Sequence, residues 1–384
     1  MTAGLFAGIG GLERGFAASG IHASTLVEYW EPAKRILAQR FPDADLSGDV
    51  ADVEALPRVD VLSAGFPCTD LSQAGRMRGI GGAESGLVRH VFRLLPSADP
   101  TWLVFENVRN MLALDGGRAM RYLVDELEDR GYRWAYRLVD SRSSGVPQRR
   151  QRVLVVASRT EDPRGVLFAD EVGEPGEETY SSDAFGFYWT EGLTGLGWAR
   201  DAVPTLKGGS TVGIPSPPAV WVRNAELGRR IVTPTIEDAE AMQGFPRGWT
   251  EAAAKGESRN GPRWKLTGNA VTVGMSKWLG RRLVTPGGFS ELASEKLEAG
   301  RRWPVAAWGS KGGVWSVNAS MWPIRSSYQH LLDVMDRDAA RPLSARATAG
   351  FLSRTERSSL RFDAEFLVAV KEHAAYMAVG PQAV

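Results

Sequence analysis

The sequence has few of the residues that hold metals or form covalent cross-links. Among 384 residues there are one cysteine, Cys68, and four histidines. A single cysteine excludes a disulfide within the chain and any metal site built from clustered cysteines. With so few histidines we expect neither a zinc site nor any other bound metal. The sequence therefore predicts a protein of a reducing, intracellular compartment, and a chain of this length can bury a full core without cross-links.

The chain also lacks an excess of charge and long apolar runs. Lys and Arg number 46 against 45 Asp and Glu, so any nucleic-acid site has to be a local basic patch. No apolar run reaches membrane-spanning length, and the first residues, MTAGLFAGIGGLERGF, do not have the pattern of a signal peptide. We expect a soluble protein of two or three domains, or one large domain with an insertion.

Short apolar runs alternate with amphipathic segments through the first 160 residues. Runs such as VDVLSAG and TWLVFE are typical of strands that are buried on both faces. The alternation predicts an α/β fold with a doubly wound, mostly parallel sheet, in which ligands bind at the carboxyl ends of the strands. We expect strands at 2–6, 23–28, 59–65, 101–106, 132–140 and 152–158, and helices at 11–19, 31–40 and 118–130.

The character of the sequence changes after residue 160. Gly, Pro and Trp become frequent, and helical periodicity returns only from residue 233, with one apolar helical face over 268–284. We expect three parts: a catalytic domain of residues 1–160 and 231–284, a small irregular domain of residues 161–230, and a C-terminal extension of residues 285–384 with helices near 344–359 and 363–377.

The turn FAGIGG, residues 6–11, joins the first expected strand to the first expected helix. Its glycines let the backbone approach a ligand at a helix N-terminus, although a plain tight turn or a dinucleotide site would also fit. Glu28 ends the second strand, where a carboxylate usually binds ribose hydroxyls, and Asp49 suits an adenine amino group. Tyr29 and Trp30 can flank the ring. Together these residues predict a nucleoside cofactor.

Cys68 follows Phe66 and Pro67 at the end of a predicted central strand. A free cysteine is more often a buried structural thiol than a nucleophile. Its place at a strand end, with Pro67 restricting the backbone before it, favours a nucleophile that reacts as the thiolate. The glycine-rich segment 72–87, which carries Arg76 and Arg78, is either a surface loop or a lid that closes over an anionic polymer.

Two further segments carry polar side chains at strand ends. Glu106 and Asn107 follow a buried strand, and Glu106 is either a general acid or base or a solvated loop residue. In GVPQRRQRV, Arg150 and Arg152 alternate along an incoming strand and should point to one face. They are either the charges of an edge strand or planar donors aimed at a carbonyl oxygen.

The order of these pieces resembles that of the DNA (cytosine-5) methyltransferases, which use S-adenosylmethionine. Each piece is weak alone, but the Pro-Cys, Glu-Asn-Val and Gln-x-Arg-x-Arg elements together, at these separations, are specific. The resemblance covers residues 1 to about 284 and implies a Rossmann-like methyltransferase domain and a target-recognition domain at 161–230. The helical C-terminal extension of residues 285–384 lies outside the resemblance, and no role follows for it. The matching pieces are FAGIGG, VEY, GDV, GFPCTDLSQAG, ENV, QRRQR, TPTIEDAEAMQGFP and GNAVTVG.

The resemblance implies a covalent reaction on a cytosine that is flipped out of duplex DNA. Cys68 would attack C6, Glu106 would hydrogen-bond N3 and the exocyclic amine, and Arg152 would contact O2. C5 would then take the methyl group, giving 5-methylcytosine. Pro67, Asn107 and Arg150 would complete this catalytic group.

The resemblance also implies the binding residues. Glu28 would bind the ribose of S-adenosylmethionine, and Asp49 the adenine amine. The other expected cofactor contacts are Phe6, Ala7, Gly8, Ile9, Gly10, Tyr29, Val50, Pro67, Leu87, Asn269, Ala270 and Val271. The expected DNA contacts are Ser72, Arg76, Arg78, Gln148, Lys207 and Thr211.

The resemblance further implies a cytoplasmic protein of a prokaryote or a phage, acting as a monomer on double-stranded DNA. A cognate restriction endonuclease or the proteins of a defence system are its candidate partners. Thr69 stands where Gln is frequent in the family, so no role follows for it.

Three rival functions are each opposed by one feature of the sequence. An RNA cytosine-5 methyltransferase would carry a Cys-Phe-Thr signature, which is absent. A catalytically silent DNA-binding scaffold would not need Cys68, Glu106 and Arg152. A nicotinamide oxidoreductase would explain the glycine turn, but not the Pro-Cys, Glu-Asn-Val and Gln-x-Arg-x-Arg elements.

Overall fold

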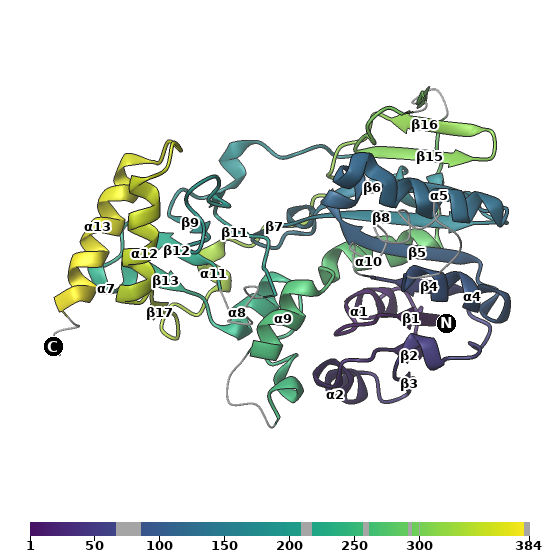
Figure 1. The fold of residues 1–384 in the computed structure, drawn as a ribbon, viewed down its shortest axis with the longest axis horizontal. Coiled ribbons are helices and arrows are strands. Elements are labelled where there is room, and N and C mark those ends of the chain that lie inside the picture. Colours follow the sequence, from purple (N-terminus) through teal and green to yellow (C-terminus); the bar gives the residue numbers. More distant parts are fainter. Residues whose placement is uncertain (67–85, 209–216, 256–260, 291–293, 299, 380–384) are drawn as a thin grey trace. The chain divides into compact units, whose positions relative to one another are not determined.

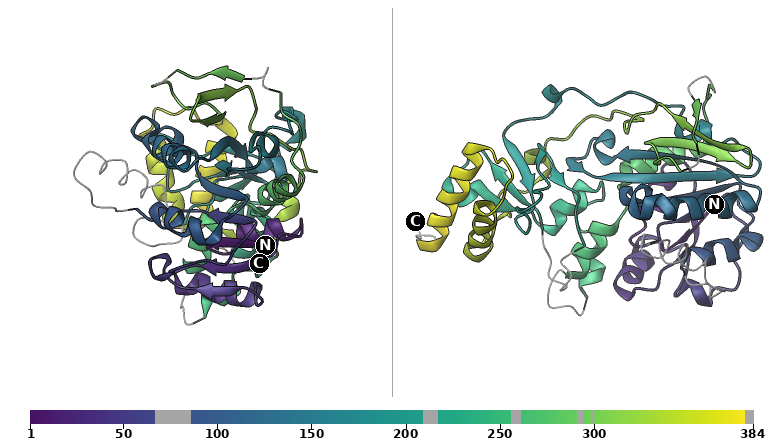
Figure 2. Two further views of the ribbon diagram at one scale, coloured as in Figure 1. Left: turned by 90° about the vertical axis from the view of Figure 1, so that its right-hand side faces the viewer. Right: turned by 45° about the horizontal axis from the view of Figure 1, so that its top comes forward.

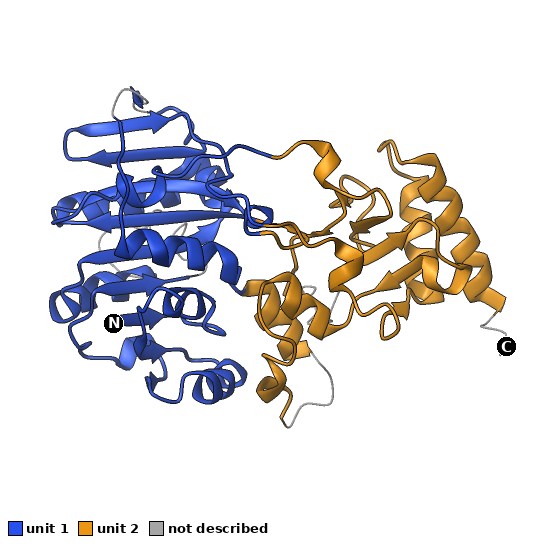
Figure 3. Cartoon of the chain, turned by 180° about the vertical axis from the view of Figure 1, so that it is seen from behind, with its two compact units in different colours: residues 1–144, 151–174, 270–326 blue, residues 145–150, 175–269, 327–384 orange. Residues whose placement is uncertain are grey.

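The structure, a computed structural model, divides the chain into two compact units (Figure 3). Unit 1 contains residues 1–144, 151–174 and 270–326, and unit 2 contains residues 145–150, 175–269 and 327–384. This division differs from the expected domains, because residues 231–269 belong to unit 2 and the predicted C-terminal extension is shared between the units. The described residues are 1–66, 86–208, 217–255, 261–290, 294–298 and 300–379.

Unit 1 is built on one large sheet with helices on both faces (Figures 1 and 2). Its strands are β1 (Thr2–Leu5), β2 (Ala23–Val27), β3 (Asp45–Ser47), β4 (Val61–Ala64), β5 (Trp102–Val108), β6 (Arg133–Asp140), β8 (Gln151–Ser158), β14 (Ser294–Lys296), β15 (Ala306–Ser310) and β16 (Gly313–Val317). Its α-helices are α1 (Gly11–Ala17), α2 (Glu31–Arg40), α4 (Val88–Ala98), α5 (Arg118–Asp129), α6 (Arg164–Leu167) and α10 (Val273–Val284). Its 3₁₀ turns are η1 (Val50–Asp52), η2 (Arg109–Leu112), η3 (Leu114–Gly117) and η4 (Ser141–Ser144).

The strand order in this sheet, over the described residues, is β14-β16-β15-β6-β8-β5-β4-β1-β2-β3. The half from β3 to β5 is parallel, and every pairing from β5 to β14 is antiparallel. The Rossmann-like α/β class is therefore confirmed, while the sheet is mixed and only its N-terminal half is parallel. Within the antiparallel half, β5 and β6 lie on either side of β8, and the segment that joins them contains the helix α5.

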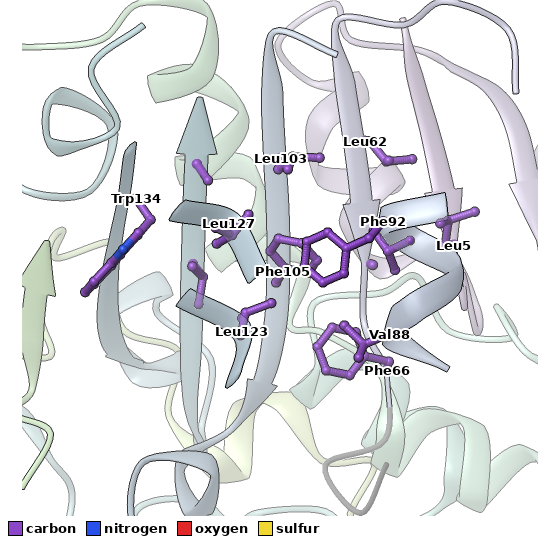
Figure 4. Packing of buried hydrophobic residues seen from close by; sticks show 14 of the residues in the cluster. Leu5, Leu62, Phe66, Val88, Phe92, Leu103, Phe105, Leu123, Leu127 and Trp134 are labelled. Carbon is purple, nitrogen blue, oxygen red and sulfur yellow. The ribbon is translucent and has the colours of Figure 1, made fainter. Parts of the chain in front are cut away.

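Apolar strands between two helical layers form the core of unit 1. On one face, α4 and α5 pack against the sheet through side chains such as Phe92, Leu123 and Leu127, with Phe105 between them (Figure 4). On the other face, α1, α6 and α10 pack against Val104, Leu154 and Val156. Burial on both faces explains why these strands read as continuous apolar runs in the sequence.

The hairpin of β15 and β16 extends the sheet beyond β6, an element that the sequence did not predict. Trp303, which leads into it, packs edge-on against Trp134 and Tyr136 at ring distances of 6.0 and 5.8 Å. The Tyr136 hydroxyl donates to the carbonyl of Pro304 at 2.7 Å. These aromatic contacts place the first part of the predicted extension in unit 1.

Helices α1 and α10 approach each other closely, which joins the end of the catalytic sequence to its beginning. The Ser276 hydroxyl donates to the carbonyl of Gly11 at 2.7 Å. A Cβ atom on Gly15 would lie 2.0 Å from the Ser276 hydroxyl oxygen and 2.6 Å from the backbone nitrogen of Lys277. Only glycine allows two helix backbones to pack at this distance.

Unit 2 contains a smaller, five-stranded sheet in the order β10-β9-β12-β13-β17 and a two-stranded pairing of β11 with β7, counted over the described residues. Its strands are β7 (Gln148–Arg149), β9 (Ala184–Phe187), β10 (Ala199–Arg200), β11 (Val203–Pro204), β12 (Ala219–Val222), β13 (Ile231–Thr233) and β17 (Arg341–Pro342). Its helices are η5 (Glu177–Thr179), α7 (Leu227–Arg230), α8 (Ile236–Met242), η6 (Glu251–Ala254), α9 (Gly261–Asn269), α11 (Leu331–Val334), α12 (Ala345–Glu356) and α13 (Ala364–Val379).

The two C-terminal helices belong to the core of unit 2. Phe351 of α12 and Phe366 of α13 pack against Phe187 of β9 at ring distances of 5.2 and 4.9 Å. Phe366 also contacts Trp221 of β12 at 5.6 Å. The predicted helices at 344–359 and 363–377 therefore exist, and they cover the sheet of the irregular region.

Asp201 joins the C-terminal segment of unit 2 to its sheet. This residue is 1% exposed and has a φ of 51°, in the left-handed region. Its carboxylate accepts hydrogen bonds from the backbone N–H groups of Ser181 and Leu331, both at 2.9 Å, and lies 2.6 Å from His330 Nδ1. The bond to Asp201 raises the pKa of His330 above its ordinary value. The buried carboxylate of Asp201 thus ties its own segment to two others, at Ser181 and at His330–Leu331.

None of the helices formed by the described residues is long and apolar enough to cross a membrane.

The close packing of α1 and α10 gives a stability prediction. Changing Gly15 to Ala should lower the free energy of unfolding by about 1–3 kcal/mol, because the new methyl group overpacks the contact with Ser276. The higher helix propensity of alanine recovers at most about 1 kcal/mol. The measurement is urea unfolding followed by circular dichroism. Gly288→Ala is the control, since a Cβ there meets nothing within 4 Å. Equal stability of G15A and G288A would contradict the packing.

Candidate active site

β1 is the switch point of the sheet, because the chain continues from it to β2 and β3 on one side and then returns to β4 and β5 on the other. β2 lies on one side of β1 and β4 on the other, both parallel to it. In open α/β sheets, ligands bind at the carboxyl ends of the strands at such a switch point. The segments that leave these ends are the ones predicted from the sequence to form the site: Phe6–Gly10 after β1, Glu28 and Tyr29 after β2, and Phe66 after β4.

The glycine turn after β1 has an unusual backbone. Phe6, Gly8 and Gly10 have φ values of 56°, 58° and 77°. A bulky residue such as Phe6 rarely adopts the left-handed region, and such outliers gather at ligand sites. A Cβ on Gly10 would lie 2.3 Å from the Phe41 ring, whereas one on Gly8 would meet nothing within 4 Å. The backbone at Gly8 is therefore open to a ligand.

Two other residues of this turn face the protein. Ile9 is 1% exposed and lies in the core, so only its backbone can face a ligand. The carbonyl of Ala7 accepts from the N–H of Gly10 at 2.9 Å and closes the turn.

Glu28 fastens this turn to the end of β2. Its carboxylate accepts from the backbone N–H groups of Gly8 and Trp30 at 2.9 and 2.8 Å. Burial raises the pKa of Glu28, and the backbone N–H groups oppose that shift. The side chain of Tyr29, next in sequence, is 72% exposed. A carboxylate held in this way has a fixed orientation and can still accept a hydrogen bond from a ribose hydroxyl.

The other expected cofactor residues of unit 1 lie on separate elements. The Asp49 carboxylate accepts from the N–H of Ala51 at 2.9 Å and so caps η1, whose first residue is Val50. Leu87 immediately precedes α4, and its side chain packs against the core. Ala270 and Val271 lie between α9 and α10, and the Val271 carbonyl would be 2.6 Å from a Cβ on Gly11.

Glu13 is a buried acid that the sequence analysis missed. It is 2% exposed in α1, and burial raises its pKa. The hydroxyl of Ser63 in β4 donates to Glu13 Oε1 at 3.0 Å. A Cβ on Gly4 of β1 would lie 2.3 Å from the same oxygen. Glycine in the middle of a short strand was the one available signal of this close approach.

Glu106 and Arg152 form an ion pair at the end of β5. Glu106 is opposite Leu154 in the antiparallel pairing of β5 with β8, and Arg152 is opposite Val108. The two side chains are diagonal neighbours on one face, where long side chains can meet. Arg152 Nε lies 2.8 Å from Glu106 Oε1, and both side chains are 9% exposed.

The environment of this pair leaves Glu106 able to bind a further group. Burial lowers the pKa of Arg152, and the charge of Glu106 opposes that shift. The ion pair with Arg152 involves Oε1, and a Cβ on Gly65 would lie 3.6 Å from the other oxygen, Oε2. This carboxyl group can therefore exchange a proton or hydrogen bond with a ligand beside an arginine that cannot deprotonate.

Asn107 ties the end of β5 to the segment that leads to Cys68. Its side-chain amide donates to the carbonyl of Phe66 at 3.1 Å, and its oxygen accepts from the N–H of Val108 at 2.9 Å. The Phe66 ring packs edge-on against Phe105 at 5.9 Å, two rings labelled in Figure 4, and against Phe6 at 6.4 Å. A Cβ on Gly65 would lie 3.6 Å from Glu106 Oε2. The chain therefore enters the Pro-Cys segment directly beside the Glu106 carboxyl group.

Seven residues discussed in the sequence analysis lie outside the described residues: Pro67, Cys68, Thr69, Ser72, Arg76, Arg78 and Thr211.

Arg150 does not share a strand face with Arg152, which corrects the sequence prediction. β7 ends at Arg149 and β8 begins at Gln151, so Arg150 falls in the break between them. Its guanidinium is fully buried in unit 2 and donates to the carbonyls of Gly268 and Leu206 at 2.9 and 3.4 Å. It supports the backbone of unit 2.

Gln148 also has an internal role. Its side chain is 0% exposed, donates to the carbonyl of Met242 at 3.1 Å and accepts from the N–H of Leu206 at 3.0 Å. A side chain buried in this way cannot contact DNA without unpacking, so the structure does not support the predicted DNA contact.

Lys207 and Asn269 are exposed in unit 2. Lys207 pairs with Glu191, and its ammonium lies 4.1 Å from the centre of the Tyr188 ring. The Asn269 side-chain oxygen would lie 3.2 Å from a Cβ on Gly208.

No group of three or more His, Cys, Asp or Glu side chains within the described ranges could hold a metal ion.

The fold is a Rossmann-like α/β fold of the kind found in methyltransferases. The structure resembles the Dnmt2 methyltransferase of S. pombe, with a TM-score of 0.54 at 14% identity over 74% of this chain and 98% of that one. It resembles the methyltransferase EhMeth of Entamoeba histolytica with a TM-score of 0.51 at 16% identity, over 73% of this chain and 97% of that one. These likenesses concern the fold alone.

The sequence comparisons establish the family. Residues 1–183 match the family C-5 cytosine-specific DNA methylase. The chain is 43% identical to the type II methyltransferase M2.BsuMI of Bacillus subtilis, over 94% of this chain and 95% of the relative. It is 27% identical to the type II methyltransferase M.MspI of Moraxella, over 70% of this chain and 66% of the relative. The chain therefore belongs to the C-5 cytosine-specific DNA methylases and is a DNA (cytosine-5) methyltransferase, and enzymes of this family use S-adenosylmethionine.

The bond between Asn107 and Phe66 gives a testable prediction. Changing Asn107 to Ala should lower the free energy of unfolding by about 1–3 kcal/mol, because the buried Phe66 carbonyl loses its donor. Urea unfolding followed by circular dichroism measures the change. Asn110→Ala is the matched control, since Asn110 is an exposed asparagine three residues further along. An N107A protein as stable as N110A would show that this bond does not hold the segment.

Proposed function

We propose that this enzyme methylates C5 of a flipped-out cytosine in duplex DNA, with Cys68 as the nucleophile and Glu106 and Arg152 as the groups that bind the base. The observation that supports the proposal most is the Glu106–Arg152 ion pair beside Gly65 and Phe66, two residues before the Pro-Cys sequence. A carboxyl group and a guanidinium offer a donor or acceptor for N3 and a donor for O2. N3 and O2 lie on the same edge of cytosine, so two neighbouring side chains can bind both atoms.

C5 of cytosine is part of an aromatic ring and is a poor nucleophile, so it must be activated before it can accept a methyl group. Covalent addition of Cys68 to C6 provides this activation. The Cys68 thiolate forms a bond to C6, and the electrons of the C5–C6 double bond move towards the N3 and O2 edge. Glu106 in its protonated form donates a hydrogen bond to N3, and Arg152 donates to O2, so both stabilise the charge that develops there. C5 then has the character of an enamine carbon.

S-adenosylmethionine, when bound, supplies a methyl group on a sulfonium that C5 can take. The ring is restored when a base removes the C5 proton and the C6–S bond breaks, which releases the Cys68 thiolate. Flipping the cytosine out of the duplex costs roughly a few kcal/mol, and contacts with the enzyme offset that cost.

The residues after β1, β2 and β3 fit the cofactor. The open backbone at Gly8 would lie along it, Glu28 would bind the ribose hydroxyls, and Asp49 with Val50 would bind the adenine edge. Tyr29 is exposed where it can cover the ring. Leu87, Ala270 and Val271 would complete the apolar part of the pocket.

Unit 2 is the part of the chain that we infer to read the DNA sequence. Lys207 is its exposed candidate for a phosphate contact, and the helices α12 and α13 support its sheet rather than form a separate domain. Similarity to type II methyltransferases over nearly the whole chain favours a restriction-modification or related defence role, with a cognate endonuclease as partner. We infer a monomer acting in the cytoplasm.

Covalent trapping tests the proposed nucleophile. A duplex containing 5-fluorocytosine at the target position should form an adduct that survives a denaturing gel, because fluorine at C5 blocks the final elimination. Cys68→Ser should abolish the adduct. An adduct that persists undiminished in C68S would contradict the nucleophile assignment.

A methyl-transfer assay with normal duplex DNA and with tRNA tests the other roles. Glu106→Gln should slow methylation of duplex DNA about 10²–10⁴-fold, as expected for loss of a general acid. Glu161→Gln is the control, because Glu161 is an exposed glutamate on the loop after β8. Methylation of tRNA in preference to duplex DNA would overturn the proposed substrate.

A further inference from the structure

Arg93 of α4 is linked to the turn that carries Asp49. Its guanidinium donates to two carbonyls of that turn, from Nη1 to Val53 at 2.7 Å and from Nη2 to Val50 at 2.9 Å. The bonds join positions that are 40 and 43 residues apart in sequence. A guanidinium has a rigid fork of donors, so binding two carbonyls at once fixes the orientation of both.

The Val50 carbonyl connects Arg93 to Asp49 through a single peptide group. This carbonyl and the N–H of Ala51 belong to the same planar peptide unit. Arg93 binds the carbonyl end, and the Asp49 carboxylate accepts from the N–H end at 2.9 Å. Hydrogen bonds in such a chain strengthen one another, because each polarises the group between them. Holding this peptide plane therefore also holds the carboxylate of Asp49.

The ring of His90 lies beside the guanidinium. Arg93 Nη2 lies 3.3 Å from His90 Nδ1, and Arg89 Nε donates to the other ring nitrogen of His90 at 3.3 Å. The apolar side of α4, including Val91, Phe92 and Leu95, is buried in the core. Arg93 therefore extends from a rigid helix, which makes it a firm support for the short turn η1.

We propose that Arg93 is a positioning residue for the cofactor, which orients the Asp49 carboxylate towards the adenine amine through the peptide group of Val50 and Ala51. The inference rests on the proposed function, since it takes Asp49 as the adenine contact. Arg93 itself does not touch the cofactor or the reacting atoms. Its loss should weaken binding of the cofactor and leave the chemical step unchanged.

The test combines binding and kinetics on the full chain. Calorimetry measures the Kd of S-adenosylhomocysteine, and steady-state assays on duplex DNA measure KM for S-adenosylmethionine and kcat. Arg93→Ala should raise both Kd and KM about tenfold, as expected for charge-assisted hydrogen bonds that are partly exposed. At saturating cofactor, kcat should stay within about twofold, because uniform binding alone is lost. Arg58→Ala is the control, since Arg58 is 84% exposed and pairs with Asp99.

A double-mutant cycle separates positioning from a general effect on stability. Asp49→Ala should raise the Kd on its own, and the double variant R93A/D49A should be no weaker than D49A, because Arg93 acts through Asp49. Arg93→Lys should give a smaller increase in Kd than R93A, since a single ammonium keeps the charge but not the fork. If R93A fails to fold, the Kd of R93K still tests whether Arg93 positions Asp49.

The outcomes distinguish the inference from the proposed function. The positioning role is wrong, and the proposed function stands, if D49A raises the Kd but R93A and R93K do not. The same conclusion holds if the increase in Kd of R93A/D49A equals the product of the increases of the two single variants. A fall in kcat with unchanged KM in R93A would also overturn the positioning role. If D49A leaves the Kd unchanged, the assignment of the adenine contact is wrong, and the role of Arg93 falls with it.

Discussion

Strands β5 and β8 run in opposite directions, and their register places Glu106 and Arg152 diagonally on one face of the sheet. A shift of one residue would turn one of these side chains to the opposite face. The register is held by apolar side chains on both faces, because Phe105 and Val155 pack in one core cluster and Val104 and Leu154 in the other. The chemistry of the site therefore depends on a strand pairing that the hydrophobic core enforces.

The rest of the site is assembled from loops that are each tied to a neighbour by one polar side chain. Glu28 holds the glycine turn, Asn107 holds the carbonyl of Phe66, and Arg93 holds the turn of Val50. In each case the side chain binds backbone groups of a loop that follows a different strand. Side-chain bonds of this kind let short loops keep a defined shape at the open edge of the sheet.

The sequence predicted the parts of the site that follow buried strands. Glu28 and Glu106 end apolar runs, and the ends of neighbouring buried strands meet at one edge, so a single chain reveals that they lie together. The helices near 344–359 and 363–377 were predicted for a similar reason, from local periodicity. The hairpin of β15 and β16 was not predicted, because its short strands are interrupted by glycines. Its place in the sheet also depends on the packing of Trp303 against aromatic rings that are distant in sequence.

The errors have the same physical origin. Arg150 was placed on a strand with Arg152, but the break between β7 and β8 is set by contacts of Arg150 with Leu206 and Gly268, far along the chain. The boundaries of the two units likewise depend on long-range packing, as Phe366 against Phe187 illustrates. Arg93 and Glu13 looked like ordinary charged residues on helices, because their backbone and hydroxyl partners leave no trace in the spacing of the sequence.

The central claim is that this chain forms 5-methylcytosine in duplex DNA by a reaction that needs Cys68. Bisulfite sequencing of DNA from cells expressing the chain tests it most directly. The account predicts cytosines protected from conversion at one fixed position within a recurring short sequence, and no such protection with the Cys68→Ser variant. Uniform conversion in cells that contain the folded wild-type protein, or protection that persists in the variant, would contradict it.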